Sequence, residues 1–188
     1  MNNKNMRVLT NIKPTLLFIS IFFISTGFAY FLGDWNIDPN YNIKFTGVKS
    51  EGTFSGLTGK IIFSKNDLEH SSINVSVNVN SIKTGNNTKD DHAKGAGWLD
   101  AKKHPKISFA STSFQKKENQ FVVIGLLELH GVRKEVTIPF TFDETKSTPE
   151  FSGEFDVNMS DYGVKGGGMG FMMDKKVRVS LRIPVLKK

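Results

Sequence analysis

Residues 72–80 have the sequence SINVSVNVN, in which aliphatic and polar side chains alternate without a break. Side chains of a β-strand point alternately to the two faces of its sheet, so this period of two indicates one buried and one solvated face. A second alternating segment, 106–109, follows after a long polar connection. The two segments are expected to belong to an antiparallel sheet wrapped around an apolar interior.

Comparable alternation recurs at a spacing of roughly 8–14 residues, which is typical of all-β barrels and sandwiches. No helical period of useful length interrupts it, and only residues 86–104 are expected to form a long loop or a short helix. The chain is therefore predicted to fold as one all-β domain of eight or nine strands. The predicted strands are 41–46, 51–59, 60–63, 72–80, 106–114, 121–129, 132–142, 151–159 and 177–185.

Three local features refine this prediction. Gly52, Gly56 and Gly59 are spaced along one predicted strand, and glycines in a closing sheet mark bends. Residues 121–129 are apolar almost throughout, which is typical of a strand covered on both faces. Pro139 cannot donate a backbone hydrogen bond, so it is expected at a sheet edge or a bulge.

The N-terminus has the parts of an export signal. Lys4, Arg7 and Lys13 precede a long apolar run that ends in small residues, and no acidic residue intervenes. This order defines a secretory signal peptide, predicted here as residues 1–29. An uncleaved inner-membrane anchor is the alternative, because the uncharged segment 14–33 is about as long as a membrane span. Either topology places the following domain in the periplasm or outside the cell.

The composition excludes several classes of function. The chain has no cysteine, so disulfides, thiolate metal sites and a catalytic thiol are excluded. Its formal net charge is +7, and three of the positive charges belong to the leader. The remaining 22 basic and 18 acidic side chains leave a net charge of +4, which is typical of an ordinary solvated surface. It is also compatible with contact with an anionic membrane surface, but not with nucleic-acid binding. A homodimer is compatible with the sequence.

The strands carry enough apolar surface either to fill a barrel or to line a deep pocket, and periodicity does not separate the two. Eleven of the 16 phenylalanines follow residue 33, mostly at alternating positions. An eight-stranded barrel is either filled by side chains or holds one small ligand. The predicted pocket lining is Phe45, Phe54, Ile73, Val75, Val77, Trp98, Phe109, Leu127, Phe140, Phe155, Met169, Phe171, Met172 and Val179.

No arrangement of catalytic residues is evident, because the chain has neither a GxSxG motif nor a Cys–His pair. His92 is expected to hold its loop on the barrel, and His130 to serve a structural role before a turn glycine. Residues 166–170, GGGMG, lack the Lys-Ser/Thr of a phosphate-binding loop and are predicted to form a flexible hairpin before the last strand. The apolar side chains of this segment are expected either to flank the pocket entrance or to pack at the barrel end. One cluster of candidate ligands matches no recognised metal-site spacing, so no metal is expected there: Asp90, Asp91, His92, Asp100 and His104.

Seven short motifs in a fixed order, from Trp35 to Val164, resemble the YceI-like family. Most of them occupy turn and packing positions. The sequence departs from the family pattern at Ala93 and at Trp98-Leu99, where the loop over one barrel mouth is expected to be looser. The motifs are Trp35-x-Ile37-Asp38-Pro39, Gly52-x-Phe54-x-Gly56-x-x-Gly59, Ser81-Ile82-x-Thr84-Gly85, Asp91-His92, Asp100-Ala101-x-x-x-Pro105-x-Ile107-x-Phe109, Gly125-x-Leu127-x-Leu129-x-Gly131-Val132-x-Lys134-x-Val136 and Asp161-Tyr162-Gly163-Val164.

The resemblance implies an eight-stranded antiparallel β-barrel of lipocalin-like architecture, here over residues 34–188, that is exported to the periplasm. It also implies an apolar pore holding a polyisoprenoid chain, such as a quinone or polyprenyl tail, and no catalytic cofactor. The first functional hypothesis is therefore a non-enzymatic lipid carrier. The alternative is a solid-core barrel that acts as an interaction or stress-response module, and an enzyme has the least support.

Overall fold

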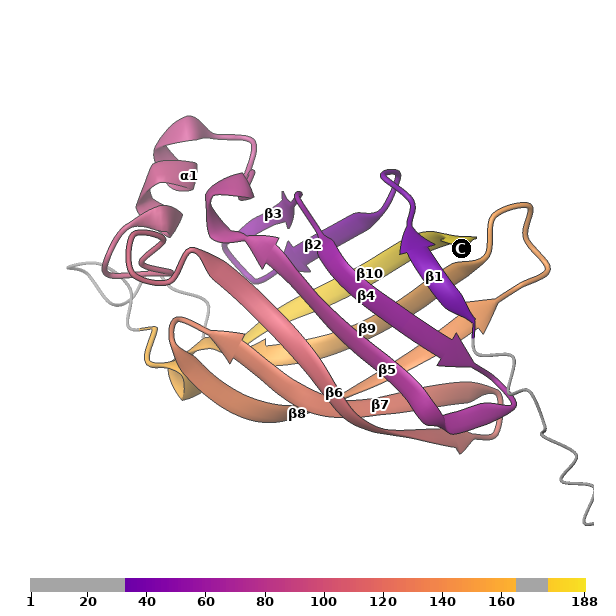
Figure 1. The fold of residues 1–188 in the computed structure, drawn as a ribbon. Coiled ribbons are helices and arrows are strands. Elements are labelled where there is room, and N and C mark those ends of the chain that lie inside the picture. The colour runs from indigo at the N-terminus through magenta and orange to yellow at the C-terminus, as the bar shows by residue number, and fades with distance from the viewer. Residues whose placement is uncertain (1–32, 165–175) are drawn as a thin grey trace, which may run out of the picture.

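The computed structural model describes residues 33–164 and 176–188, whose strands form one antiparallel sheet that closes on itself (Figure 1). From β4 to β10 each strand pairs with the next along the chain, and a pairing between β1 and β10 completes the circle. The strands are β1 (Asp34–Ile37), β2 (Asn42–Thr46), β3 (Glu51–Phe54), β4 (Thr58–Ser64), β5 (Asp67–Asn78), β6 (Lys106–Lys117), β7 (Gln120–Leu129), β8 (Val132–Asp143), β9 (Glu150–Asn158) and β10 (Lys176–Lys187).

One α-helix, α1 (Asn87–Lys94), interrupts the connection between β5 and β6, within the segment expected to hold a loop or short helix. Two short 3-10 helices follow β5 (Val79–Ser81) and β9 (Met159–Tyr162). The predicted leader, residues 1–29, lies outside the described residues. Among the described residues, no helix combines the length and the apolar composition needed to cross a bilayer.

The ten segments make eight barrel strands, because two of the strands are interrupted. β1 and β2 both pair with β10, but residues 38–41 between them lie opposite only residues 183 and 184 of β10. β3 and β4 likewise pair with β2 and β1, and residues 55–57 separate them. The predicted class, a closed eight-stranded antiparallel barrel, is therefore confirmed.

The predicted boundary between strands 51–59 and 60–63 is wrong. The break falls at 55–57, where Gly56 has a φ of +72° that side chains rarely adopt. Gly59 lies inside β4, where a β-carbon would collide with the carbonyl oxygen of Asn74 in β5. Gly56 therefore lies at the interruption of the strand, whereas Gly59 allows the close approach of the β5 backbone. The spacing of the glycines did not distinguish these two roles.

Two strand limits also differ from the alternating pattern. The segment β1 was not predicted as a strand, because its four residues are too few to establish a period of two. The strand β5 begins at Asp67 rather than near Ser72, since its polar first residues pair with β4 and do not need a buried face. Residues 79–81, expected to continue the strand, form a 3-10 turn instead.

The strand β7 is covered on both faces only near its start. On its outer face, Val122 is 4% exposed but Leu126 is 40% exposed, so the expectation of two buried faces is wrong for the second half. Pro139 of β8 lies opposite Val122, and the pairing of β8 with β9 begins only at Phe140. Within the described residues, the part of β8 up to Pro139 has no pairing partner on the side facing β9. It is therefore a sheet edge there, as expected of a proline.

Aromatic rings fill the end of the barrel that carries the β4–β5 and β6–β7 turns. Phe63 is only 1% exposed, and its ring centroid lies 5.2–5.9 Å from five other phenylalanine rings. The indole of Trp35 donates a hydrogen bond of 3.0 Å to the Phe63 carbonyl oxygen. This end of the barrel is a solid core. We call these rings the aromatic cluster: Trp35, Phe63, Phe114, Phe121, Phe140, Phe142 and Phe151.

Glu150 begins β9 near the aromatic cluster and is 5% exposed. Its carboxylate accepts hydrogen bonds from Lys146 Nζ at 2.6 Å and from Arg182 at 2.9 Å. The hydrogen bond from Lys146, with a smaller contribution from Arg182, holds the pKa of Glu150 below its ordinary value of 4.5 although burial opposes this. Because the folded pKa is the lower one, the resulting stabilisation is complete above pH 4.5 and is lost as the pH falls through the folded pKa.

We expect Glu150→Gln to lower the urea midpoint of unfolding at about pH 7 and to lower it less at about pH 3, because the native carboxylate is stabilising only when ionised. Urea titrations at both pH values measure this difference. Glu144→Gln is the matched control, since Glu144 pairs with Lys65 at 2.9 Å on the surface. Parallel pH profiles for the wild type and Glu150→Gln would contradict the prediction.

Candidate functional site

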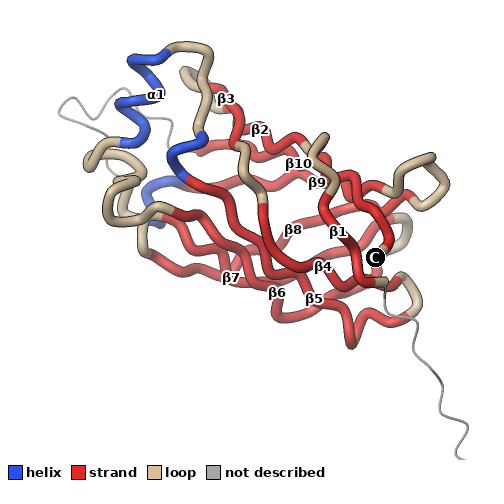
Figure 2. Tube along the Cα trace, turned by 45° about the horizontal axis from the view of Figure 1, so that its top comes forward, coloured by secondary structure: helices blue, strands red, loops and turns tan. Residues whose placement is uncertain are grey.

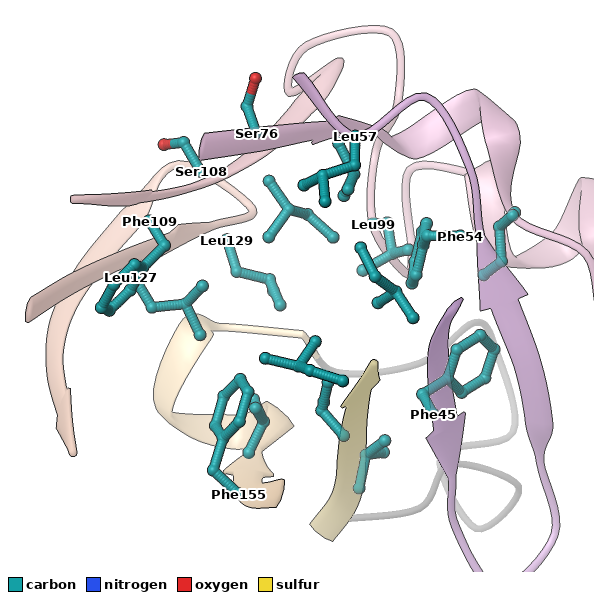
Figure 3. A pocket seen from close by; sticks show the side chains of 18 of the residues that line it. Phe45, Phe54, Leu57, Ser76, Leu99, Ser108, Phe109, Leu127, Leu129 and Phe155 are labelled. Carbon is teal, nitrogen blue, oxygen red and sulfur yellow. The ribbon is translucent and has the colours of Figure 1, made fainter. Parts of the chain in front are cut away.

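The other half of the barrel encloses a cavity of about 1080 Å³. Aliphatic and aromatic side chains from β2 to β10 form most of its wall, and Phe140 and Phe151 of the aromatic cluster form its floor. In Figure 3, Phe54 and Leu129 point into this space, whereas Ser76 points away from it. The barrel is thus solid at one end and hollow at the other.

Strand register brings the lining side chains together in rows across the sheet. In one row, Phe109 of β6 lies opposite Val75 of β5 and Leu127 of β7. In another row, Val179 of β10 lies between Phe45 of β2 and Phe155 of β9. Because cross-strand partners share one face of a sheet, each row places three apolar side chains side by side in the cavity wall.

Every predicted lining residue that falls within the described ranges lines the cavity. Met169, Phe171 and Met172 lie outside the described residues, as does the predicted hairpin at 166–170. Contact of any of these side chains with a ligand stays a prediction. The predicted residues found in the wall are Phe45, Phe54, Ile73, Val75, Val77, Trp98, Phe109, Leu127, Phe140, Phe155 and Val179.

The sequence analysis missed other lining residues of the same kind. Most lie on the inward face of a strand, so continuing the period of two along each strand would have found them. Five of them lie outside the strands, where a period of two does not apply: Leu57, Ile82, Ala93, Leu99 and Met159. The missed apolar residues are Ile43, Leu57, Ile61, Ile82, Ala93, Leu99, Ile107, Val123, Leu129, Ile138, Phe151, Val157, Met159, Val177, Leu181 and Ile183.

The cavity extends to residues of α1 and of the turn between β2 and β3. Figure 2 shows that the end of the barrel carrying α1 is opposite the C-terminus. We call this end the mouth. One side of its rim belongs to the turn between β2 and β3, and the other to α1. The charged and polar rim residues, of mixed sign, are Lys49, Ser50, Glu51, Lys89, Asp91 and His92.

Asp90 fixes the connection that carries α1. It is 2% exposed, and its Oδ1 accepts hydrogen bonds of 2.7 Å from both the backbone N–H and the hydroxyl of Thr84. These bonds, with a smaller contribution from Lys83 at 3.4 Å, hold the pKa of Asp90 below its ordinary value. Asn86 caps the helix by accepting a hydrogen bond from the Lys89 N–H. The local acidic residue therefore has a structural role.

His92 does not have the role expected of it. The residue is exposed on α1 at the rim, and its imidazole forms no hydrogen bond with any residue in the described ranges. Asp90, two positions earlier and on the buried side of the helix, holds the loop instead. Trp98 and Leu99, where the motifs depart from the pattern that the sequence resembles, lie against the cavity after α1.

The chemistry of the cavity is that of an apolar binding site. Its titratable lining residues belong to the rim, and the wall below them offers aliphatic groups and rings, whereas the hydroxyls of Ser76 and Ser108 point away from it (Figure 3). A site of this kind binds by burying apolar surface, and a small number of polar groups orient the ligand. The geometry suits a molecule with a long apolar part and a more polar end.

Comparison with known proteins places this geometry in a family. The model of the YceI-like domain matches residues 35–185. A UPF0312 protein of Pseudomonas savastanoi pv. phaseolicola is 34% identical over 124 residues, which cover 62% of this chain and 65% of that relative. Protein YceI of Escherichia coli O6:H1 is 29% identical over 164 residues, 80% of this chain and 85% of that protein. The resemblance seen in the motifs is thereby confirmed.

Solved structures share the fold. Burkholderia cenocepacia BcnA superposes with a TM-score of 0.74 at 22% identity, covering 81% of this chain and all of that one. A polyisoprenoid binding domain from Saccharophagus degradans, implicated in plant cell wall breakdown, superposes with a TM-score of 0.61 at 12% identity, covering 84% of this chain and 99% of that one. At these identities the likeness shows the fold alone.

Proposed function

The chain belongs to the YceI-like family, and on this premise we propose that it is a non-enzymatic carrier or binder of a polyisoprenoid-type lipid, such as a quinone or a polyprenyl tail. The observation that carries the proposal is the apolar cavity below a polar rim. The ligand named for the Saccharophagus degradans domain supports the same chemical class.

The size and polarity of the cavity favour a long apolar ligand. Ligand pockets commonly enclose roughly 300–1,000 Å³, so a cavity of about 1080 Å³ is at the upper end of this range. Each buried methylene contributes about 0.8 kcal/mol, so an apolar tail binds tightly without a polar contact inside the barrel. The mixed charges of the rim suit a polar head group at the mouth.

A solid-core interaction module is the second candidate. The aromatic cluster favours it, because it fills one end of the barrel as a protein core would. The cavity counts against it, since a packed core does not leave a space of this size. Lipid binding therefore accounts for more of the barrel than the alternative does.

We further propose that the domain acts outside the cytoplasm and collects its ligand at a membrane surface. The basic and apolar leader supports export. Val48, beside the rim residue Lys49 in the β2–β3 turn, is 92% exposed, and an apolar side chain next to a cation at the mouth suits contact with an anionic bilayer. A homodimer stays a prediction.

Mass spectrometry of organic extracts from the natively expressed, purified protein tests the proposed function. We expect one prenyl lipid per protein molecule, because the barrel cavity of about 1080 Å³ has room for one lipid tail. Extraction of the same protein after delipidation by reversed-phase chromatography and refolding is the control. A native preparation without stoichiometric lipid that also fails to take up polyprenols of any length would contradict the proposal.

A further inference from the structure

Three potential metal ligands meet outside the cavity, near the mouth. Asp100 and His104 belong to the connection between α1 and β6, and His130 belongs to the turn between β7 and β8. One ligand atom from each residue lies within 4.8 Å of the other two. None of the three residues lines the cavity, so the cluster is separate from the proposed lipid site.

Asp100 is a largely buried residue whose carboxylate has few protein partners. The residue is 6% exposed, and within the described ranges its only charged partner is the exposed Lys103, at 3.5 Å. No described side chain or backbone group donates a hydrogen bond to this carboxylate. Since no fully buried side-chain oxygen among the described residues lacks a partner, the unbonded Asp100 oxygen is in reach of solvent. A cation entering from solvent can therefore bind it without displacing a protein donor.

His130 is held in the orientation and tautomer of a metal ligand. Its Nδ1 lies 3.1 Å from the carbonyl oxygen of Tyr162, and a carbonyl only accepts, so Nδ1 carries the proton. The Nε2 lone pair is consequently available. Metal-binding histidines commonly donate the second ring N–H to a backbone carbonyl in this manner.

The backbone directs these side chains toward one point at some cost. Asp100 and His130 have φ values of +45° and +52°, in the left-handed region that residues other than glycine rarely adopt. The His104 ring lies 5.1 Å from that of His130 and against Gly131, where a β-carbon would collide with it. Strained residues that converge on one place are typical of functional sites.

We propose that Asp100, His104 and His130 bind one first-row divalent ion, of which zinc is the probe. Two imidazoles and a carboxylate suit zinc and its neighbours, whereas calcium and magnesium prefer oxygen ligands alone. Zinc–ligand bonds of about 2.1 Å place tetrahedral ligands about 3.4 Å apart, so the cluster contracts by at most about 1.4 Å on binding. Three protein ligands leave a fourth position for water or an external ligand.

The ion would join two segments that lie just beyond the paired ends of β6 and β7. Asp100 and His104 follow the cavity residues Trp98 and Leu99, and His130 is part of a tight hairpin turn. Metal binding would therefore fix the connection at the mouth to the barrel. At a zinc concentration about 100-fold above Kd, we expect Tm to rise by about 5–10 °C.

Calorimetric titration of the tag-free, EDTA-treated protein with zinc tests the site, and one ion per chain is expected. Asp100→Asn and His130→Asn should each weaken binding at least about 10-fold. Asparagine tolerates the left-handed backbone at both positions, and in His130→Asn its amide replaces the Nδ1–H donor to Tyr162. Both variants therefore remove a ligand with little change in the fold, which Tm in EDTA checks.

His70→Asn is the matched control, because His70 contacts Asp67 at 2.8 Å at the other end of the barrel. It should bind zinc as the wild type does. The wild-type protein also gives a test without mutation, since ¹H–¹⁵N spectra should show zinc-shifted ring nitrogens for two of its four histidines. Absence of stoichiometric uptake, uptake unchanged in Asp100→Asn and His130→Asn, or uptake lost in His70→Asn would overturn the proposal.

Discussion

Phe63→Ala is expected to lower the free energy of unfolding by about 3–5 kcal/mol, the largest stability effect anticipated in this barrel. Phe63 is 1% exposed and lies at the centre of the aromatic cluster, with five phenylalanine rings around it. Those rings come from β6, β7, β8 and β9, whereas Phe63 comes from β4. Removing the Phe63 ring therefore creates a cavity bordered by five strands, and these strands cannot all move inward to fill it.

Chemical denaturation measures the loss, and two variants separate its causes. Phe63→Leu keeps most of the volume and should cost less than Phe63→Ala. Phe45→Ala removes an identical ring from the hollow end, where Phe45 is half-buried beside Phe54 at a centroid distance of 5.6 Å. It should cost less as well, because the space around it is already open. Equal losses at positions 45 and 63 would contradict the division into a solid and a hollow end.

The sequence is sufficient to predict the strands but not all of their limits. Alternation identifies β5 from Ile73, Val75 and Val77, because a side-chain period of two is a local property. Interruptions such as residues 38–41 are decided by register against β10, which is more than 140 residues away in sequence. The four-residue strand β1 has too few side chains to show a period at all.

Side-chain alternation also makes part of the cavity wall predictable. Inward-facing positions follow from alternation, so Val75, Leu127 and Val179 are placed in the wall by pattern alone. Alternation does not say whether inward-facing rings meet. Phe142 stacks on Phe151 at 4.2 Å and helps to close one end, whereas Phe45 borders an open space. That difference depends on strand tilt and taper, which are properties of the closed barrel.

The candidate metal site shows the limit of arguments from spacing. Asp100 and His104 are close in sequence, but His130 reaches them through the pairing of β6 with β7. Its neighbour Gly131 indicated only a turn. Sequence spacing therefore groups Asp100 and His104 with Asp90 and His92, although Asp90 and His92 belong to α1 and are not part of the cluster.

Val179→Trp is expected to lose at least about 90% of its bound lipid while remaining folded. Val179 packs against residues of both buried clusters, so it lies between the floor of the cavity and the mouth. An indole there occupies the space in which an apolar chain would lie. Excluding even two methylenes from the cavity costs about 1.6 kcal/mol, which is more than tenfold in affinity.

The expected stability change of Val179→Trp is small, because the added ring fills open space rather than a packed core. Ser180→Trp is the matched control: it adds the same ring at the next position, on the opposite face, where the Ser180 hydroxyl contacts Glu154 at 2.9 Å. Lipid-to-protein ratios from mass spectrometry should fall only in the first variant. If Val179→Trp carries as much lipid as the wild type, the ligand does not lie in the barrel, and the cavity is not the binding site.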